Sequence, residues 1–215
     1  MVNVLYPLGK TSHHNDFEIE NSIRLLRKFS TDKLHIIVAG QVPENIDADE
    51  VIQLPKQIMN RYKTVAYNLY NSLPEKFTVL MNDDFFVTQE FSFKKMPLYF
   101  DGTIKQRLKQ VWINRTYYNN LKNSSTDEND LNFAVHFPMP IRDPLLFRLI
   151  LSNILQDEKE EGISFRNLYG NSVDEKKEFK KDVKHNTFRG AIDSDWFSIG
   201  DAFLNEQGKK YILSL

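Results

Sequence analysis

Two adjacent carboxylates follow the apolar run at residues 77–81, in the sequence Asn82-Asp83-Asp84. Acidic side chains directly after such a run do not continue into a core, because an uncompensated buried charge is costly. Adjacent carboxylates also repel each other, and a divalent cation removes that repulsion. Mg²⁺ or Mn²⁺ takes one or two carboxylates and completes its coordination with phosphate and water. The motif therefore predicts a metal–phosphate site with Asp83 and Asp84 as ligands; an acidic turn that caps a helix or loop is the alternative.

The crowding of these carboxylates leads to an expectation about stability. If repulsion between Asp83 and Asp84 dominates in the metal-free protein, Asp84→Asn should leave the fold intact or slightly more stable. The same substitution should abolish turnover, because it removes a metal ligand.

A second candidate is the polar loop that follows the apolar run at residues 2–8. Backbone amides near a glycine and a helix N-terminus favour anionic groups, and Lys10 adds positive charge beside Gly9. The loop is not a Walker loop, because the GxxxxGK[ST] spacing is absent. Leu8, Gly9 and Lys10 are thus candidates for contacting a phosphate, and an ordinary surface loop is the alternative.

Polar residues near the start of a helix expected at 58–73 are candidates for the same site. Asn60 and Lys63 share one helix face at a spacing of three residues. That arrangement suits a nucleotide or a phosphate. A solvated helix surface explains these residues equally well.

Two candidates for catalysis lie in the second half of the chain. His136 ends an apolar run, where a histidine serves as a general base, a metal ligand or a hydrogen-bonded core residue. Asp201 closes a segment of polar groups beside aromatic residues at 193–201. It is either catalytic or a cap for the helix expected at 202–205.

Strands and helices alternate along the first half of the chain. Apolar runs predict strands at 2–8, 34–39, 50–54 and 77–81, and helical periodicity predicts helices at 16–29 and 58–73. This order is typical of βαβ units and a mainly parallel sheet. Ligands of such sheets bind outside the carboxyl ends of the strands. We therefore expect Gly9 and Asn82–Asp84 to line one cleft.

The second half is less regular. The expected elements are a strand with a turn at 97–102, a helix at 103–121, a strand at 133–137 and a helix capped by Asp143 with Pro144 at its first position. The charge-dense segments at 156–161 and 174–184 are expected to be solvated.

Composition limits the classes of protein that fit. A chain of 215 residues can bury one substantial core without a second domain. With 28 Lys and Arg against 29 Asp and Glu, it lacks the basic excess of an extensive nonspecific nucleic-acid surface. It contains no cysteine, which removes disulfides and thiolate sites and fits a reducing cytoplasm. We do not expect the N-terminus to be a signal peptide, because no basic region is followed there by a long apolar one, and no apolar run approaches the roughly 20 residues of a membrane span.

Several segments occur in an order that is similar to a known family. They are VLYPLG at 4–9, NDFEIENSIR at 15–24, MNDDFF at 81–86, HFPMP at 136–140 and, less closely, WFSIGD at 196–201. Together they resemble the Stealth family of capsular-polysaccharide sugar-phosphate transferases and related small phage and bacterial glycosyltransferase-like proteins. The acidic-aromatic block is the most specific of these segments. The chain is shorter than the family pattern and has Tyr6-Pro7-Leu8-Gly9-Lys10 where that pattern has a WVDG-like motif.

The resemblance implies a single α/β domain, residues 1–215, in the type A glycosyltransferase arrangement. Residues 1–90 would bind the nucleotide and residues 91–215 would face the acceptor. By carry-over, Asp84 would ligate Mn²⁺ or Mg²⁺ on a donor diphosphate, and Asp83 would assist it or bind donor hydroxyls. His136 would be catalytic or a further metal ligand.

The activity that we expect is glycosyl transfer from a nucleotide sugar. The metal would neutralise the leaving diphosphate, and a carboxylate or histidine would deprotonate the acceptor hydroxyl. Transfer of a sugar-1-phosphate from the same donor to a polysaccharide is one alternative, and a non-catalytic interaction protein that binds nucleotide sugars is another. The acceptor is expected to be a polysaccharide, another glycopolymer or a modified nucleobase. The location would be the cytoplasm, that of the host if a phage encodes the chain.

Overall fold

The computed structural model describes residues 1–9, 16–56, 61–109, 115–123, 131–157 and 164–215. The first half contains β1 (Val2–Leu8), α1 (Phe17–Phe29), β2 (Leu34–Gly40), β3 (Glu50–Gln53), α2 (Arg61–Ser72), β4 (Thr78–Leu80) and β5 (Phe85–Val87). The middle contains η1 (Phe93–Lys95), β6 (Leu98–Thr103), α3 (Ile104–Leu108), α4 (Arg115–Asn123), β7 (Asn132–Ala134), β8 (Met139–Ile141) and α5 (Pro144–Gln156). The last part contains α6 (Phe165–Ser172), β9 (Lys177–Phe179), β10 (Lys184–His185), β11 (Trp196–Ile199), η2 (Asp201–Phe203) and α7 (Glu206–Ser214).

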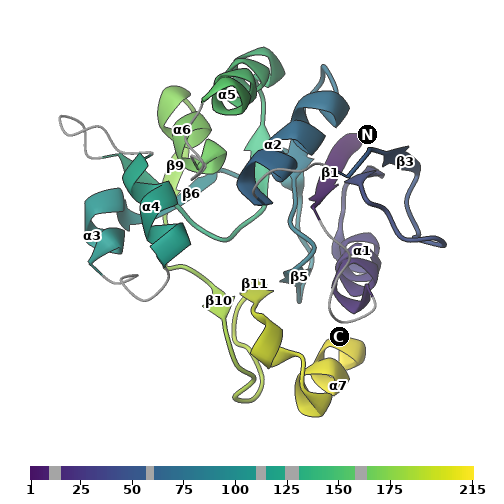
Figure 1. Ribbon diagram of the computed structural model, residues 1–215. Coiled ribbons are helices and arrows are strands. Elements are labelled where there is room, and N and C mark those ends of the chain that lie inside the picture. The colour runs from purple at the N-terminus through teal and green to yellow at the C-terminus, as the bar shows by residue number, and fades with distance from the viewer. Residues whose placement is uncertain (10–15, 57–60, 110–114, 124–130, 158–163) are drawn as a thin grey trace.

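The central sheet has the strand order β3-β2-β1-β4-β8. Strands β3, β2, β1 and β4 run parallel, and β8 pairs with β4 in the antiparallel direction. Helices cover both faces of this sheet (Figure 1). The prediction of an α/β fold with a mainly parallel central sheet is thereby confirmed.

The sheet is apolar on both faces, as parallel sheets covered by helices are. Alternate side chains of β1 point to opposite faces. Val4 and Tyr6 belong to a core that α1 and α7 also enter, through residues such as Ile23 and Ile212. Leu5 belongs to the second core, where α2 and α5 pack. The apolar run at the N-terminus therefore becomes a central strand because it supplies both cores.

Two small sheets complete the fold. One has the order β10-β11-β5, and the other has the order β7-β6-β9. Strand β5 comes directly after the acidic motif, and β11 pairs with it in the antiparallel direction. Residues 180–183 connect β9 of one small sheet to β10 of the other. The acidic motif thus lies between the central sheet and a sheet built largely from the end of the chain.

Of the local expectations for the second half, one differs from the structure and another agrees with it. The helix expected at 103–121 is not continuous in the described residues, because α3 ends at Leu108 and α4 begins at Arg115. The expected cap of α5 is present, since the Asp143 carboxylate accepts a hydrogen bond of 2.9 Å from the Leu146 amide. Among the described residues, no helix has both the length and the apolar character needed to cross a bilayer.

Candidate functional site

The acidic motif lies at the carboxyl edge of the central sheet. Leu80, the last residue of β4, is paired with Leu5 of β1, and the Met81 amide donates to the Leu5 carbonyl at 2.9 Å. The chain then leaves the sheet as Asn82-Asp83-Asp84. Because β1 and β4 are parallel neighbours, this motif and Gly9 follow strand ends at the same edge.

Asp83 and its surroundings are tied to the central core. The Ser22 hydroxyl donates to the Phe85 carbonyl at 2.6 Å and lies 2.8 Å from the Tyr6 hydroxyl. Burial raises the pKa of Tyr6, the bond with Ser22 opposes that rise, and the negative charge of Asp83 adds to it. The acidic motif is therefore held against β1 and α1.

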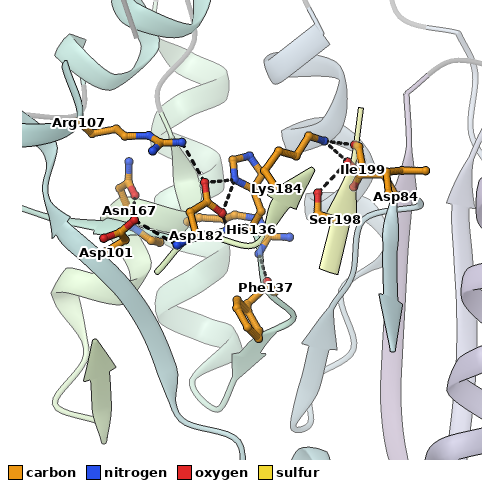
Figure 2. Close-up of polar contacts among 12 residues, drawn as sticks. Asp84, Asp101, Arg107, His136, Phe137, Asn167, Asp182, Lys184, Ser198 and Ile199 are labelled. Atoms are coloured by element: carbon orange, nitrogen blue, oxygen red, sulfur yellow. Dashed lines mark hydrogen bonds and ion pairs between the residues drawn. The ribbon is translucent and has the colours of Figure 1, made fainter. Parts of the chain in front are cut away.

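The Asp84 carboxylate has one engaged oxygen and one buried oxygen. Its Oδ2 accepts from Lys184 Nζ at 2.5 Å and from Ser198 Oγ at 3.1 Å. Figure 2 shows Lys184 extended toward Asp84, with Ser198 and Ile199 beside them. Within the described residues, the buried Oδ1 has no hydrogen-bond partner.

Protein cations offset the negative charge of the motif. Lys184 pairs with Asp84, and Arg166 donates to Asn82 Oδ1 at 2.8 Å and to the Phe137 carbonyl at 2.9 Å. Burial lowers the pKa of Arg166 to about 10, and the charge of Asp84 acts in the opposite direction. Arg166 is therefore protonated at neutral pH. In the metal-free protein, these two cations therefore already offset part of the repulsion between the carboxylates.

The residues of the motif fit a cation that is shared with a substrate. Among the described residues, no group of three or more His, Asp or Glu side chains could hold a metal ion by itself. Mg²⁺ needs only one or two carboxylates when phosphate oxygens supply further ligands. The unpaired Asp84 Oδ1 and the adjacent Asp83 carboxylate are the groups that could bind such an ion.

His136 is held by a buried carboxylate that the sequence did not identify. Its Nδ1 lies 2.9 Å and 3.1 Å from the two carboxylate oxygens of Asp182, and its amide donates to Asp182 at 3.2 Å. Arg107 pairs with the same carboxylate at 2.9 Å. The Asp182 side chain is 6% exposed and that of His136 is 28% exposed. The imidazole is thus anchored on one side and partly open to solvent on the other.

The ionisation of Asp182 decides which nitrogen of His136 carries the proton. Burial alone would raise the pKa of Asp182, but His136 and Arg107 outweigh that effect and hold it at about 2. An ionised carboxylate only accepts hydrogen bonds. Nδ1 of His136 must therefore be the donor, and in the neutral ring the lone pair is at Nε2, where a general base needs it.

The short segment 182–184 connects His136 to the acidic motif. Asp182 contacts His136, and Lys184, two residues later, contacts Asp84. The Asp182 amide donates to the Asp101 carboxylate at 3.1 Å, and the Val183 carbonyl accepts from the Ser198 amide at 3.2 Å. Figure 2 shows the two contacts at the two ends of this segment. The expectation that residues 174–184 are solvated is wrong for Asp182 and Lys184.

A polar cavity adjoins the Asp182 side of the site. It has a volume of about 370 Å³ and is lined by Asp101, Gly102, Gln106, Arg107 and Lys109. Both Asp101 and Arg107 also contact Asp182. The cavity therefore lies behind the carboxylate that orients His136.

The candidates from the first loop are only partly described. Leu8 is buried, and its carbonyl accepts a hydrogen bond of 2.6 Å from Asn68 Nδ2 of α2. Gly9 lies against α2, since a Cβ there would be 3.6 Å from Val65 Cγ2. Lys63 donates to the Asp157 carbonyl after α5. Lys10 and Asn60 lie outside the described residues, and a phosphate contact by any residue of this loop remains a prediction.

Asp201 is not one of the residues that form the contacts described above. It is the first residue of η2, and its side chain is exposed. The nearby backbone is connected to the acidic motif, because the Ile199 amide donates to the Asp84 carbonyl at 3.2 Å. A catalytic role for Asp201 remains a prediction.

No protein-family model matches this chain, and no curated protein matches it.

Proposed function

We propose that this chain is a glycosyltransferase that uses a nucleotide-sugar donor and a divalent cation. The observation that carries the proposal is the segment 182–184, which contacts both His136 and the acidic motif. Asp182 and Lys184 are separated by one residue, so their backbones lie about 7 Å apart if the segment is extended. One short segment therefore contacts both an acidic motif for a diphosphate and a base for an acceptor.

Each group has a role in this proposal. Asp83 and Asp84 would hold Mn²⁺ or Mg²⁺, which would neutralise charge on the leaving diphosphate. Asn82 is fixed by Arg166 and would keep the motif in place. His136 would take the proton of the acceptor hydroxyl at Nε2. The acceptor oxygen would then bond to the anomeric carbon while the bond from that carbon to the diphosphate oxygen breaks.

The polar cavity lies on the Asp182 side of His136, away from Nε2, so it would hold a part of the acceptor that is distant from the reacting hydroxyl. Its lining includes acidic, amide and basic side chains, which suit hydrogen bonds to a polysaccharide, another glycopolymer or a modified nucleobase. A cytoplasmic location, that of the host if a phage encodes the chain, belongs to the same proposal.

A nucleotide screen tests the proposal before the acceptor is known. UDP, GDP, UDP-sugars and GDP-sugars are added with and without Mn²⁺, and thermal unfolding is followed. A ligand at a hundredfold its dissociation constant stabilises a fold by about 2.7 kcal/mol. We expect at least one nucleotide to give such a shift in the presence of Mn²⁺, and the shift should be smaller in Asp84→Asn.

Analysis of released nucleotide then identifies the reaction. Release of UDP or GDP from the donor supports glycosyl transfer. Release of UMP or GMP would mean that the sugar-1-phosphate is transferred instead. Binding without turnover would favour a non-catalytic interaction protein, and no binding of any donor would refute the proposal.

A further inference from the structure

The Lys184 ammonium contacts the acidic motif at oxygen atoms that could also bind a metal ion. It contacts the Asp84 carboxylate at 2.5 Å and also the Ile199 carbonyl. Both partners are oxygen atoms, the ligand type that Mg²⁺ and Mn²⁺ prefer. The Lys184 side chain is 25% exposed and that of Asp84 is 18% exposed, so solvent screens this pair only in part.

We propose that Lys184 is a ligand of the donor diphosphate, and that it rests on Asp84 until a divalent cation takes its place. This inference depends on the proposed function, because it assumes that a diphosphate and a cation bind at the motif. It adds a phosphate-binding residue that sequence reasoning did not identify.

Competition for one oxygen supports this exchange. A divalent ion that binds Asp84 through Oδ1 and Oδ2 together would displace the ammonium, because Oδ2 already accepts from Lys184 and Ser198 and the ion carries the larger charge. The backbone of Lys184 stays in place, because β10 is paired with β11 and the Gly200 amide donates to the His185 carbonyl at 3.0 Å. A lysine has a flexible four-carbon stem with a compact charge at its end. The displaced ammonium therefore remains beside the motif, where a diphosphate would supply new negative charge.

Arg166 is not suited to the same exchange. Its guanidinium already donates to the Phe137 carbonyl and to Asn82, so it fixes the motif in position. Moving it would leave a buried carbonyl oxygen without its donor, which is costly. Lys184 also leaves a carbonyl oxygen, that of Ile199, but a cation at the motif could take that oxygen as a ligand.

Lys184→Met tests the proposal, and Lys181→Met is its matched control. Lys181 is an exposed lysine three residues earlier on the same segment, so its substitution changes the net charge equally. Binding of Mn²⁺ alone is measured first by calorimetry. Binding of UDP and of GDP is then measured at saturating Mn²⁺. Lys184→Arg serves as a second variant that keeps the charge.

The two measurements should move in opposite directions. In Lys184→Met, Mn²⁺ alone should bind about tenfold more tightly because its competitor is gone, and the nucleotide about tenfold more weakly because a charged donor is lost. Lys181→Met should leave both dissociation constants unchanged, and Lys184→Arg should retain most of the nucleotide affinity. If the wild type binds Mn²⁺ and nucleotide but Lys184→Met changes neither affinity, or weakens both, the exchange is refuted. If the wild type binds neither UDP nor GDP nor Mn²⁺, the proposed function itself fails.

Discussion

The substitution Asp84→Asn distinguishes two descriptions of the acidic motif by the sign of its effect on stability. If repulsion from Asp83 dominated, the fold would stay intact or gain stability. The structure instead gives Asp84 two donors, Lys184 and Ser198. An asparagine keeps an acceptor oxygen but loses the charge that balances the ammonium. We therefore expect the fold to lose stability.

The solvent exposure of the Asp84–Lys184 ion pair determines how much free energy of unfolding is lost. Exposed pairs contribute about 0–1 kcal/mol, and breaking a buried pair costs about 3–5 kcal/mol. Asp84 and Lys184 are 18% and 25% exposed, so their pair falls between these limits. Because asparagine still accepts hydrogen bonds, we expect a loss of about 1–2 kcal/mol. The melting temperature of a chain of this length should fall by about 2–4 °C for each kcal/mol lost.

Urea unfolding of a double-mutant cycle measures the interaction free energy between Asp84 and Lys184 directly. The cycle consists of the wild type, Asp84→Asn, Lys184→Met and the double variant, all without metal. We expect a coupling free energy of about 1 kcal/mol between Asp84 and Lys184. A stabilising Asp84→Asn, or a coupling below about 0.3 kcal/mol, would show that repulsion within the motif decides its energetics and that the ion pair does not.

Four further substitutions examine other parts of the structure. His136→Ala should lower turnover by on the order of 10²–10⁴-fold with nearly unchanged donor affinity, whereas activity that falls only in step with the folded fraction would identify a core histidine. In the wild type, the ionised Asp182 carboxylate adds to the free energy of unfolding. This contribution is full above pH 4 and is lost as the pH falls toward 2, because the folded pKa of about 2 lies below the unfolded value. Asp182→Asn should remove this contribution. Between pH 5 and pH 2 the wild type should therefore lose about 2 kcal/mol more in urea unfolding than this variant does. Gly40→Ala should cost at least about 3 kcal/mol, since its Cβ would meet the Leu8 carbonyl oxygen at 2.0 Å at a φ of +119°. Gly190→Ala, at a φ of +117° with open space around it, should cost only the backbone strain of about 1 kcal/mol.

The central sheet was predictable because local patterns determine it. The strand at 2–8 is apolar on both faces, which identifies a covered parallel strand without knowledge of its partners. The sequence did not identify β5 as a strand, although Phe85 and Phe86 are buried. Its partner is β11, more than one hundred residues later, and a short strand becomes recognisable only beside its neighbour.

The candidate site was predictable in part for the same reason. Asp84 and His136 follow apolar runs, so their positions at strand ends are visible in the sequence. Asp182 and Lys184 lie in a stretch rich in Lys, Asp and Glu, where composition indicates a solvated surface. The partner of Lys184 is one hundred residues away along the chain, and no local pattern reveals it. The alternation of Asp182, Val183 and Lys184 was the one available indication of an extended segment.

The charges around the acidic motif explain when a metal would be needed. Asp83 and Asp84 carry two negative charges, and Lys184 and Arg166 bring two positive charges to the motif. The motif without substrate is therefore close to neutral and has little electrostatic demand for an ion. A nucleoside diphosphate would add negative charge that these lysine and arginine side chains do not balance. The demand for Mg²⁺ or Mn²⁺ would then come from the donor, so ion and nucleotide should each strengthen the binding of the other by the same factor.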